Sequence, residues 1–116
     1  KRLRPGGTFL IETFVPDMAR LESHQWVQTK RLTEGDVWLD ACQHDPIAQT
    51  LAMQRVRISD GGIRLVPLPM RYAFPAEIDL MARVAGLEKV ARWGGWNKDT
   101  FSADSKQHVS LYRRPA

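Results

Sequence analysis

The sequence has 116 residues and a mass of 13.2 kDa, which limits it to one domain. Hydrophobic residues make up 43% and charged residues 26%, so the chain has the composition of a folded protein and is not wholly disordered. No apolar run reaches the roughly 18 residues of a membrane span, and a single cysteine excludes a disulfide framework and a cysteine-based zinc site. We therefore expect a cytoplasmic protein.

The charge balance is basic, with 17 Lys and Arg against 13 Asp and Glu and a net charge of +4. The basic residues are dispersed among acidic ones, which favours an ordinary basic surface over a polyanion-binding one. The chain begins with Lys1 and carries no signal peptide, so we expect it to be a processed or partial chain.

The first predicted element is a strand at 8–12, after a turn at 5–7. Its continuous apolar run predicts a strand buried on both faces, as in parallel sheets. Residues 16–24 have room for one or two helical turns.

An antiparallel meander is predicted over 25–74, with strands at 26–32, 37–42, 50–59 and 63–72. The turn at 60–62 is a strong hairpin signal. We expect the chain to break or bend at 44–46. Pro67 and Pro69 cannot donate backbone hydrogen bonds, which predicts a sheet edge or a bulge there.

The clearest helix is predicted over 75–85. Pro75 suits its first position and Gly86 its end. Its apolar stripe comprises Ile78, Met81, Ala82 and Ala85, widened by Leu80 and Val84. A strand at 87–93, a loop to residue 106 and a last strand at 108–113 complete the chain.

Three segments resemble the C-terminal half of a class I S-adenosylmethionine-dependent methyltransferase. They read LRPGGTFLIE at 3–12, YAFPAEIDLMARVAGL at 72–87, and WGGW at 93–96 followed by SKQHVSLY at 105–112. They are similar to the fifth strand, the last helix, and the sixth and final strands of that fold. The closest resemblance is to small-molecule and amino-sugar enzymes with an added antiparallel sheet.

The resemblance implies an α/β fold, which is α+β in this fragment: half of a Rossmann-like sheet plus a four-stranded meander, in a single domain over 1–116. It also implies that the last strand lies between 8–12 and 87–93, antiparallel to both. The family's glycine-rich cofactor turn and acidic ribose-binding residue are missing. We therefore expect S-adenosylmethionine to be bound through a missing N-terminal half, and this chain alone to be inactive.

Residues of this half are expected to line the pocket for a small polar acceptor. Glu12 ends the fifth strand at the carboxyl edge of the sheet, Arg71 and Tyr72 precede the last helix, and Trp93 offers a ring for stacking. These four are the predicted substrate-binding residues. Each also has an ordinary structural explanation: a solvated strand-end charge, a junction residue or a core anchor.

Other residues give weaker signals. His44 and Asp45 suggest a base, but adjacent side chains diverge in an extended chain. His24 and His108 lack partners at metal-ligand spacing, so no metal is expected. Trp96 is either a ligand contact or a loop anchor, and Cys42 is most simply a small core residue.

Two further interpretations stay open: a free-standing β-rich ligand-binding or dimerisation module, and a nucleic-acid-binding sheet. The second requires aromatic and basic residues on one face, which Trp26, Lys30, Trp38 and Arg57 fit only loosely. We also expect a homodimer, because the edge of the 8–12 strand and the meander are both open to association. The acceptor and the methylated atom are not identified.

Overall fold

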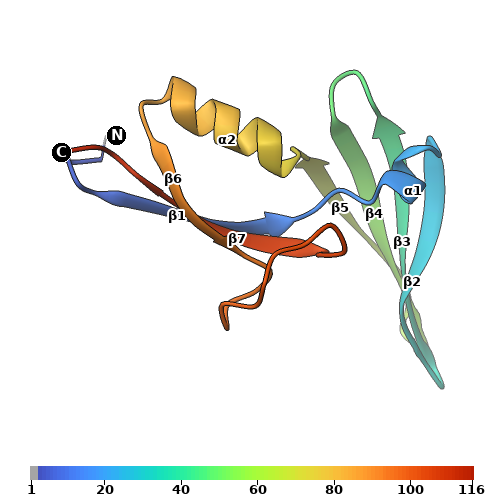
Figure 1. The fold of residues 1–116 in the computed structure, drawn as a ribbon. Coiled ribbons are helices and arrows are strands. Elements are labelled where there is room, and N and C mark those ends of the chain that lie inside the picture. Colours follow the sequence, from blue (N-terminus) through green and yellow to red (C-terminus); the bar gives the residue numbers. More distant parts are fainter. Residues whose placement is uncertain (1–2) are drawn as a thin grey trace. The chain divides into compact units, whose positions relative to one another are not determined.

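A computed structural model describes residues 3–116, so the basic residues Lys1 and Arg2 lie outside it. The chain forms two compact units (Figure 1). One comprises the chain up to Pro16 and again from Ala73, and the other is Asp17–Tyr72. Within residues 3–116, no helix has the length and apolar character needed to cross a membrane.

The first unit contains a three-stranded antiparallel sheet and one helix. The strands β1 (Thr8–Phe14), β6 (Glu88–Trp93) and β7 (Gln107–Arg113) are arranged in the order β1–β7–β6. The helix α2 (Pro75–Val84) covers one face of this sheet (Figure 1). The predicted topology, with the last strand between the other two and antiparallel to both, is confirmed.

Local signals in the sequence fix both ends of α2. Pro75 occupies the first turn, and the Glu77 carboxylate accepts a hydrogen bond of 2.9 Å from the Phe74 N–H just before the helix. At the other end Gly86 adopts a φ of +84°, a conformation that disfavours residues with a Cβ atom. The helix therefore begins and ends close to the predicted residues.

The core under α2 is narrower than the predicted apolar stripe. Ile78 and Ala82 are buried and pack with Tyr112, with Ile11 and Leu87 at the margin. The remaining apolar residues of the stripe are exposed: Leu80, Met81, Val84 and Ala85. The buried stripe is narrower than the predicted one, because the three-stranded sheet contacts only the side of the helix that carries Ile78 and Ala82.

The prediction that strand 8–12 is buried on both faces is wrong for this chain. Phe9 and Leu10 are 44% and 47% exposed. Within residues 3–116, β1 pairs with β7 along one edge and no strand pairs with its other edge. An apolar run indicates where a strand is suited to burial, but burial itself requires neighbours that this chain does not supply.

The second unit is the predicted four-stranded meander. Its strands are β2 (Gln25–Thr33), β3 (Asp36–Asp45), β4 (Thr50–Ser59) and β5 (Gly62–Arg71), paired in chain order. A short helix, α1 (Met18–Leu21), precedes them.

Two predictions about the meander have different outcomes. Pro67 and Pro69 lie on β5, an edge strand, where their missing N–H groups cost no hydrogen bond within the sheet. The break expected at 44–46 is wrong at its start, because β3 continues through His44 and Asp45. The pairing of His44 with Leu51 in β4 keeps the strand extended there.

Candidate functional site

Two of the four predicted site residues lie on the same face of the three-stranded sheet. Glu12 and Trp93 both pair with Val109, one from each side. Residues in one row across a sheet point to the same face, so these side chains flank Val109 on the face opposite α2, about 10 Å apart at two strand spacings. Glu12 is exposed and does not end its strand as predicted, because β1 continues to Phe14.

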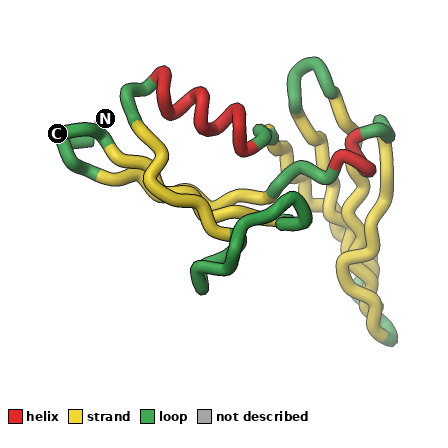
Figure 2. The backbone as a smooth tube through the Cα atoms, viewed as in Figure 1, coloured by secondary structure: helices red, strands yellow, loops and turns green. Residues whose placement is uncertain are grey.

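A long loop joins β6 to β7 (Figure 2), and it returns to the end of β6. Trp93 bridges to Thr100, and the Gly94 N–H donates a hydrogen bond of 2.7 Å to the Asp99 carbonyl. A Cβ atom at Gly94 would lie 2.9 Å from the Thr100 carbonyl oxygen, so a glycine is needed there. The ammonium of Lys98 lies 5.8 Å from the centre of the Trp93 ring. A ligand stacking on that side of the ring would displace Lys98.

The other two predicted residues belong to the second unit. Arg71 is exposed at the end of β5, whereas Tyr72 is 8% exposed. The Tyr72 hydroxyl lies 2.8 Å from Nε2 of His44, which is 5% exposed. No partner is found for Nδ1 of His44 within the described chain. The structure therefore places Tyr72 beside His44, although the sequence analysis considered these two residues independently.

The suggested His44–Asp45 pair does not form. Asp45 is exposed, and its carboxylate accepts hydrogen bonds from the N–H groups of Ile47 and Ala48 at 3.0 and 3.2 Å. Successive strand residues point to opposite faces, which separates Asp45 from the buried His44. Of the weaker candidates, Cys42 is buried as expected, Trp96 is 60% exposed, and His24 is exposed.

A buried polar network under α2 was not predicted from the sequence. Arg92 of β6 binds both carboxylate oxygens of Asp79 on α2, at 2.6 and 3.1 Å. The Tyr112 hydroxyl donates to the same carboxylate at 2.6 Å. Arg92 also donates to the Ser110 hydroxyl at 2.8 Å, and that hydroxyl lies 2.7 Å from Nδ1 of His108.

The sequence held one signal for this network. His108, Ser110 and Tyr112 alternate along β7, which places all three on one face. All three are almost completely buried, at 0%, 0% and 1% exposure. Polar residues on a buried face need partners, and these come from α2 and β6.

The network shifts the pKa values of its members. Burial opposes ionisation of Asp79, but hydrogen bonds from Arg92 and Tyr112 and the charges of Arg92 and Lys89 outweigh it, so its pKa is lowered. Burial, reinforced by the Arg92 charge, lowers the pKa of His108. Burial and the Asp79 carboxylate raise the pKa of Tyr112 to about 12. Asp79 is thus held ionised, and Tyr112 remains a phenol at neutral pH.

These contacts make the network a brace between helix and sheet. Its opposite charges, Arg92 and Asp79, are paired with each other. No group of three His, Cys, Asp or Glu side chains in residues 3–116 comes together as a metal site. Each unit therefore has its own candidate site: the sheet face carrying Glu12 and Trp93 in the first unit, and the buried Tyr72–His44 pair in the second.

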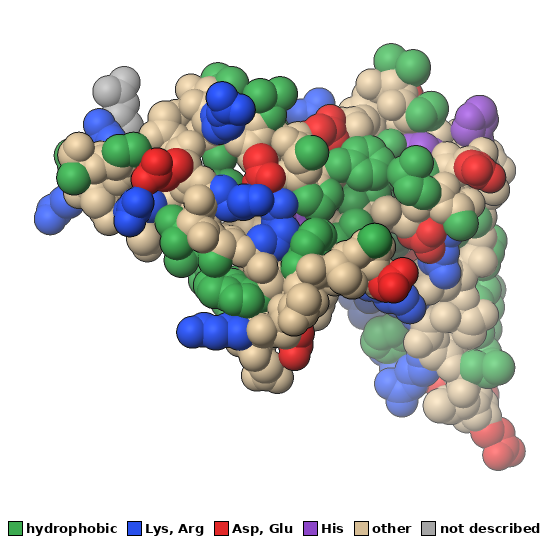
Figure 3. All heavy atoms as spheres, in the orientation of Figure 1, with side chains coloured by type: hydrophobic (Ala, Val, Ile, Leu, Met, Phe, Trp, Pro, Cys, Tyr) green, Lys and Arg blue, Asp and Glu red, His purple; other side chains and the backbone are tan. Residues whose placement is uncertain are grey.

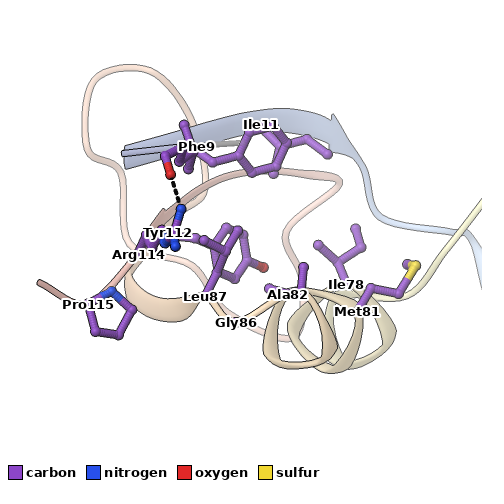
Figure 4. Close-up of a pocket in the computed structure, with 12 residues that line it drawn as sticks. Phe9, Ile11, Ile78, Met81, Ala82, Gly86, Leu87, Tyr112, Arg114 and Pro115 are labelled. Carbon is purple, nitrogen blue, oxygen red and sulfur yellow. Dashed lines mark hydrogen bonds between the residues drawn. The ribbon is translucent and has the colours of Figure 1, made fainter. Parts of the chain in front are cut away.

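An apolar groove of about 910 Å³ runs between α2 and β1 (Figure 4). Phe9, Ile11, Met81 and Leu87 line it, and the Arg114 guanidinium closes one end by donating to the Leu3 carbonyl. Tyr112 and Arg114 carry the polar side chains of the lining, and both are hydrogen-bonded within the chain, Tyr112 to Asp79 and Arg114 to the Leu3 carbonyl. The rest of the lining is apolar, which does not suit a polar acceptor.

Solved structures match almost the whole chain. The CcbJ methyltransferase from Streptomyces caelestis is 47% identical, with a TM-score of 0.89 over 97% of this chain and 48% of that one. This chain has the fold of the C-terminal half of an S-adenosylmethionine-dependent methyltransferase. A scan against protein-family models and a search of curated proteins gave no match.

More distant methyltransferases share the fold. An S-adenosylmethionine-dependent methyltransferase from Clostridium acetobutylicum ATCC 824 is 11% identical, with a TM-score of 0.72 over 98% of this chain and 47% of that one. CalS10, an amino pentose methyltransferase from Micromonospora echinaspora, is 19% identical, with a TM-score of 0.53 over 97% and 45%. The chain thus spans about half the length of these methyltransferases.

The methyltransferase fold explains the two units. The order and pairing of β1, α2, β6 and β7 agree with the fifth strand, last helix, sixth strand and final strand that the sequence resemblance predicts. The Asp17–Tyr72 unit lies in the chain between β1 and α2, where the sequence resemblance predicts an added antiparallel sheet. The family resemblance and the expected fold class are confirmed.

Proposed function

We propose that this chain is the acceptor-side half of an S-adenosylmethionine-dependent methyltransferase acting on a small polar molecule. The observation that carries the proposal is the 47% identity to the CcbJ methyltransferase over 97% of this chain. The cofactor is held by residues outside 1–116. This chain contributes the surface that orients the acceptor.

Methyl transfer requires this half of the enzyme mainly to position the acceptor. The methyl group passes from the sulfonium of the cofactor to a lone pair of the acceptor, and the acceptor loses a proton. Positioning the acceptor is therefore the main task, and an amine or hydroxyl also needs a proton acceptor nearby. We propose that, in the first unit, Glu12 binds an acceptor amine or hydroxyl and Trp93 packs against the acceptor. Arg71 and Tyr72, in the second unit, stay predicted hydrogen-bond donors to an acceptor. The amino pentose substrate named for CalS10 supports an amino sugar as acceptor class.

The test is a methyl-transfer assay of the full-length protein that contains residues 1–116. Radiolabelled S-adenosylmethionine is the methyl donor, and a panel of amino sugars and neutral sugars supplies the acceptors. Methylation of at least one amino sugar is expected. Glu12→Gln should lower kcat/KM by about tenfold, the loss of one charge-assisted hydrogen bond. Glu34→Gln, which removes a carboxylate from the β2–β3 turn, is the matched control. No transfer to any acceptor would favour the non-catalytic binding module, and equal effects of both substitutions would refute the role of Glu12.

We also propose that the chain forms a homodimer through one face of the meander. A row of aliphatic side chains crosses all four strands in register: Leu32, Val37, Ile58 and Ile63. Leu39, Val56 and Leu65 form the next row. Leu32 and Ile63 are 74% and 70% exposed, and the rows hold no charged residue. A neutral apolar face is complementary to a second copy of itself.

The size of this face suits a dimer. Four strands of nine or ten residues at about 4.8 Å spacing cover roughly 600 Å², close to the ~800 Å² per partner of a standard interface. Sedimentation equilibrium at about 50 µM should give twice the chain mass, since micromolar affinity needs about 8 kcal/mol. Ile63→Lys should give a monomer, and Val84→Lys on α2 should not. A dimer that survives Ile63→Lys would place the interface elsewhere, for example on the β1 edge.

A further inference from the structure

The reverse face of the meander carries a row of basic and aromatic residues. Arg31 on β2, Trp38 on β3, Arg57 on β4 and Arg64 on β5 pair in sequence across the sheet. The four side chains therefore form one line on one face, a line that we call the arginine row. Basic side chains are visible at this end of the sheet, near the β2–β3 and β4–β5 turns, in Figure 3.

Contacts around Trp38 hold part of the arginine row in place. The guanidinium carbons of Arg31 and Arg57 lie 5.7 and 5.1 Å from the centre of the Trp38 ring, within cation–π range. The indole N–H donates to Asp36 at 3.2 Å, and the Asp36 carboxylate lies 3.4 Å from Arg31 and 3.5 Å from Arg57. These contacts order two long side chains before any ligand arrives, which lowers the entropy cost of binding.

The aspartates do not neutralise the arginines at this end of the face. Asp40 is taken up by Arg55, which binds both of its oxygens at 2.9 and 3.0 Å. Asp36 is shared between Arg31 and Arg57. Within residues 3–116 no ion pair is found for Arg64, although it lies directly opposite Arg57 on the neighbouring strand. Glu34 and Asp60 lie in the two turns at this end, and within residues 3–116 no ion pair joins either of them to the arginine row. Arg57 and Arg64 therefore face each other as like charges, an arrangement that destabilises a sheet.

We infer that Arg57 and Arg64 bind a tetrahedral oxyanion, the phosphate or sulfate group of a small molecule. Side chains directly opposite each other in an antiparallel pair start about 5 Å apart, so both guanidinium groups reach one such anion. The planar guanidinium presents paired N–H donors that match two oxygens of phosphate or sulfate. An anion between the two arginines would also relieve their mutual repulsion.

The arginine row favours a compact anion over a nucleic acid strand. Single-stranded nucleic acids bind to sheets by stacking bases on exposed aromatic rings. The Trp38 ring already has three guanidinium groups against it, including that of Arg55 at 5.8 Å. A base would have to displace them.

The experiment uses the chain itself and does not depend on methyl transfer. NMR titration of the arginine Nε–Hε signals with inorganic phosphate and, separately, sulfate at constant ionic strength should shift the Arg57 and Arg64 signals saturably. Arg64→Gln should weaken binding at least tenfold. Arg83→Gln, which removes an exposed charge from α2, is the matched control and should leave the affinity unchanged.

Three outcomes would overturn the inference. Equal weakening by Arg64→Gln and Arg83→Gln would show a response to net charge alone. Linear, non-saturating shifts would show that no site is present. Binding of a short single-stranded oligonucleotide with no response to phosphate or sulfate would assign the row to nucleic acid instead. Preference between phosphate and sulfate identifies the oxyanion class, and saturable binding of either supports the site.

Discussion

Replacing Asp79 with asparagine is expected to destabilise the first unit strongly. The substitution keeps the size of the side chain and removes its charge. It leaves the Arg92 side chain, which is only 10% exposed, without its ionic partner. It also changes the acceptor of the Tyr112 hydroxyl, which is 2.6 Å from the carboxylate.

The expected loss in the free energy of unfolding follows from the burial of this ion pair. Breaking a buried ion pair by removing one partner costs about 3–5 kcal/mol. The lower end applies here, because Asp79 itself is 27% exposed. With an m-value of about 2 kcal/mol/M for a chain of this size, a loss of 3 kcal/mol moves the urea midpoint down by about 1.5 M. The measurement is urea unfolding followed by tryptophan fluorescence and circular dichroism.

An exposed ion pair in the same unit provides the control. The Arg113 guanidinium lies 2.7 Å from the Glu88 carboxylate, and both side chains are 52% exposed. Glu88→Gln should therefore cost less than about 1 kcal/mol. If Asp79→Asn and Glu88→Gln shift the midpoint equally, the buried network does not brace the helix against the sheet.

The pH dependence gives a second check on Asp79. Because its pKa is lowered in the folded chain, its stabilising contribution is complete above the unfolded value near 3.8 and is lost as pH falls through the folded value. The stability gap between the original chain and Asp79→Asn should therefore narrow in acid. A gap that stays constant down to the lowest pH would contradict the assigned pKa shift.

Four further outcomes are expected. The pKa of His108 is lowered by burial, so the unfolded chain takes up the proton first and stability should fall as pH drops below 6.5, by up to about 1.4 kcal/mol per pH unit; His108→Gln should flatten this slope, and an unchanged slope would contradict the shift. Near-ultraviolet titration should show a tyrosine that ionises at about pH 12 and disappears in Tyr112→Phe. Burial and the Asp40 charge raise the pKa of Cys42, so its thiol should react with a disulfide reagent slowly in the folded chain and rapidly in urea; fast reaction without urea would show that the meander opens. Calorimetry of the isolated chain with S-adenosylmethionine should give only heats of dilution, and a saturable isotherm would show that cofactor-binding residues lie within 1–116.

Short-range signals in the sequence determined the secondary structure of this protein. Pro75 and Gly86 mark the helix ends because each restricts or permits a backbone conformation regardless of the rest of the fold. The glycines at 61–62 close the β4–β5 hairpin for the same reason. The order of the strands in the first sheet followed from the family resemblance, since no local signal specifies which strands pair.

Only the tertiary structure decided burial and the contacts between distant residues. Phe9 and Leu10 are apolar residues typical of a buried strand, yet both are exposed. Their burial depends on neighbouring elements, which an apolar run in the sequence does not specify. Asp79, Arg92 and Tyr112 lie 13 to 33 positions apart, and their network exists because strand register brings them to one face beneath α2. The arginine row has the same origin. Pairing across four strands aligns residues whose charges look dispersed along the chain, because lateral neighbours in a sheet are set by register and not by sequence separation.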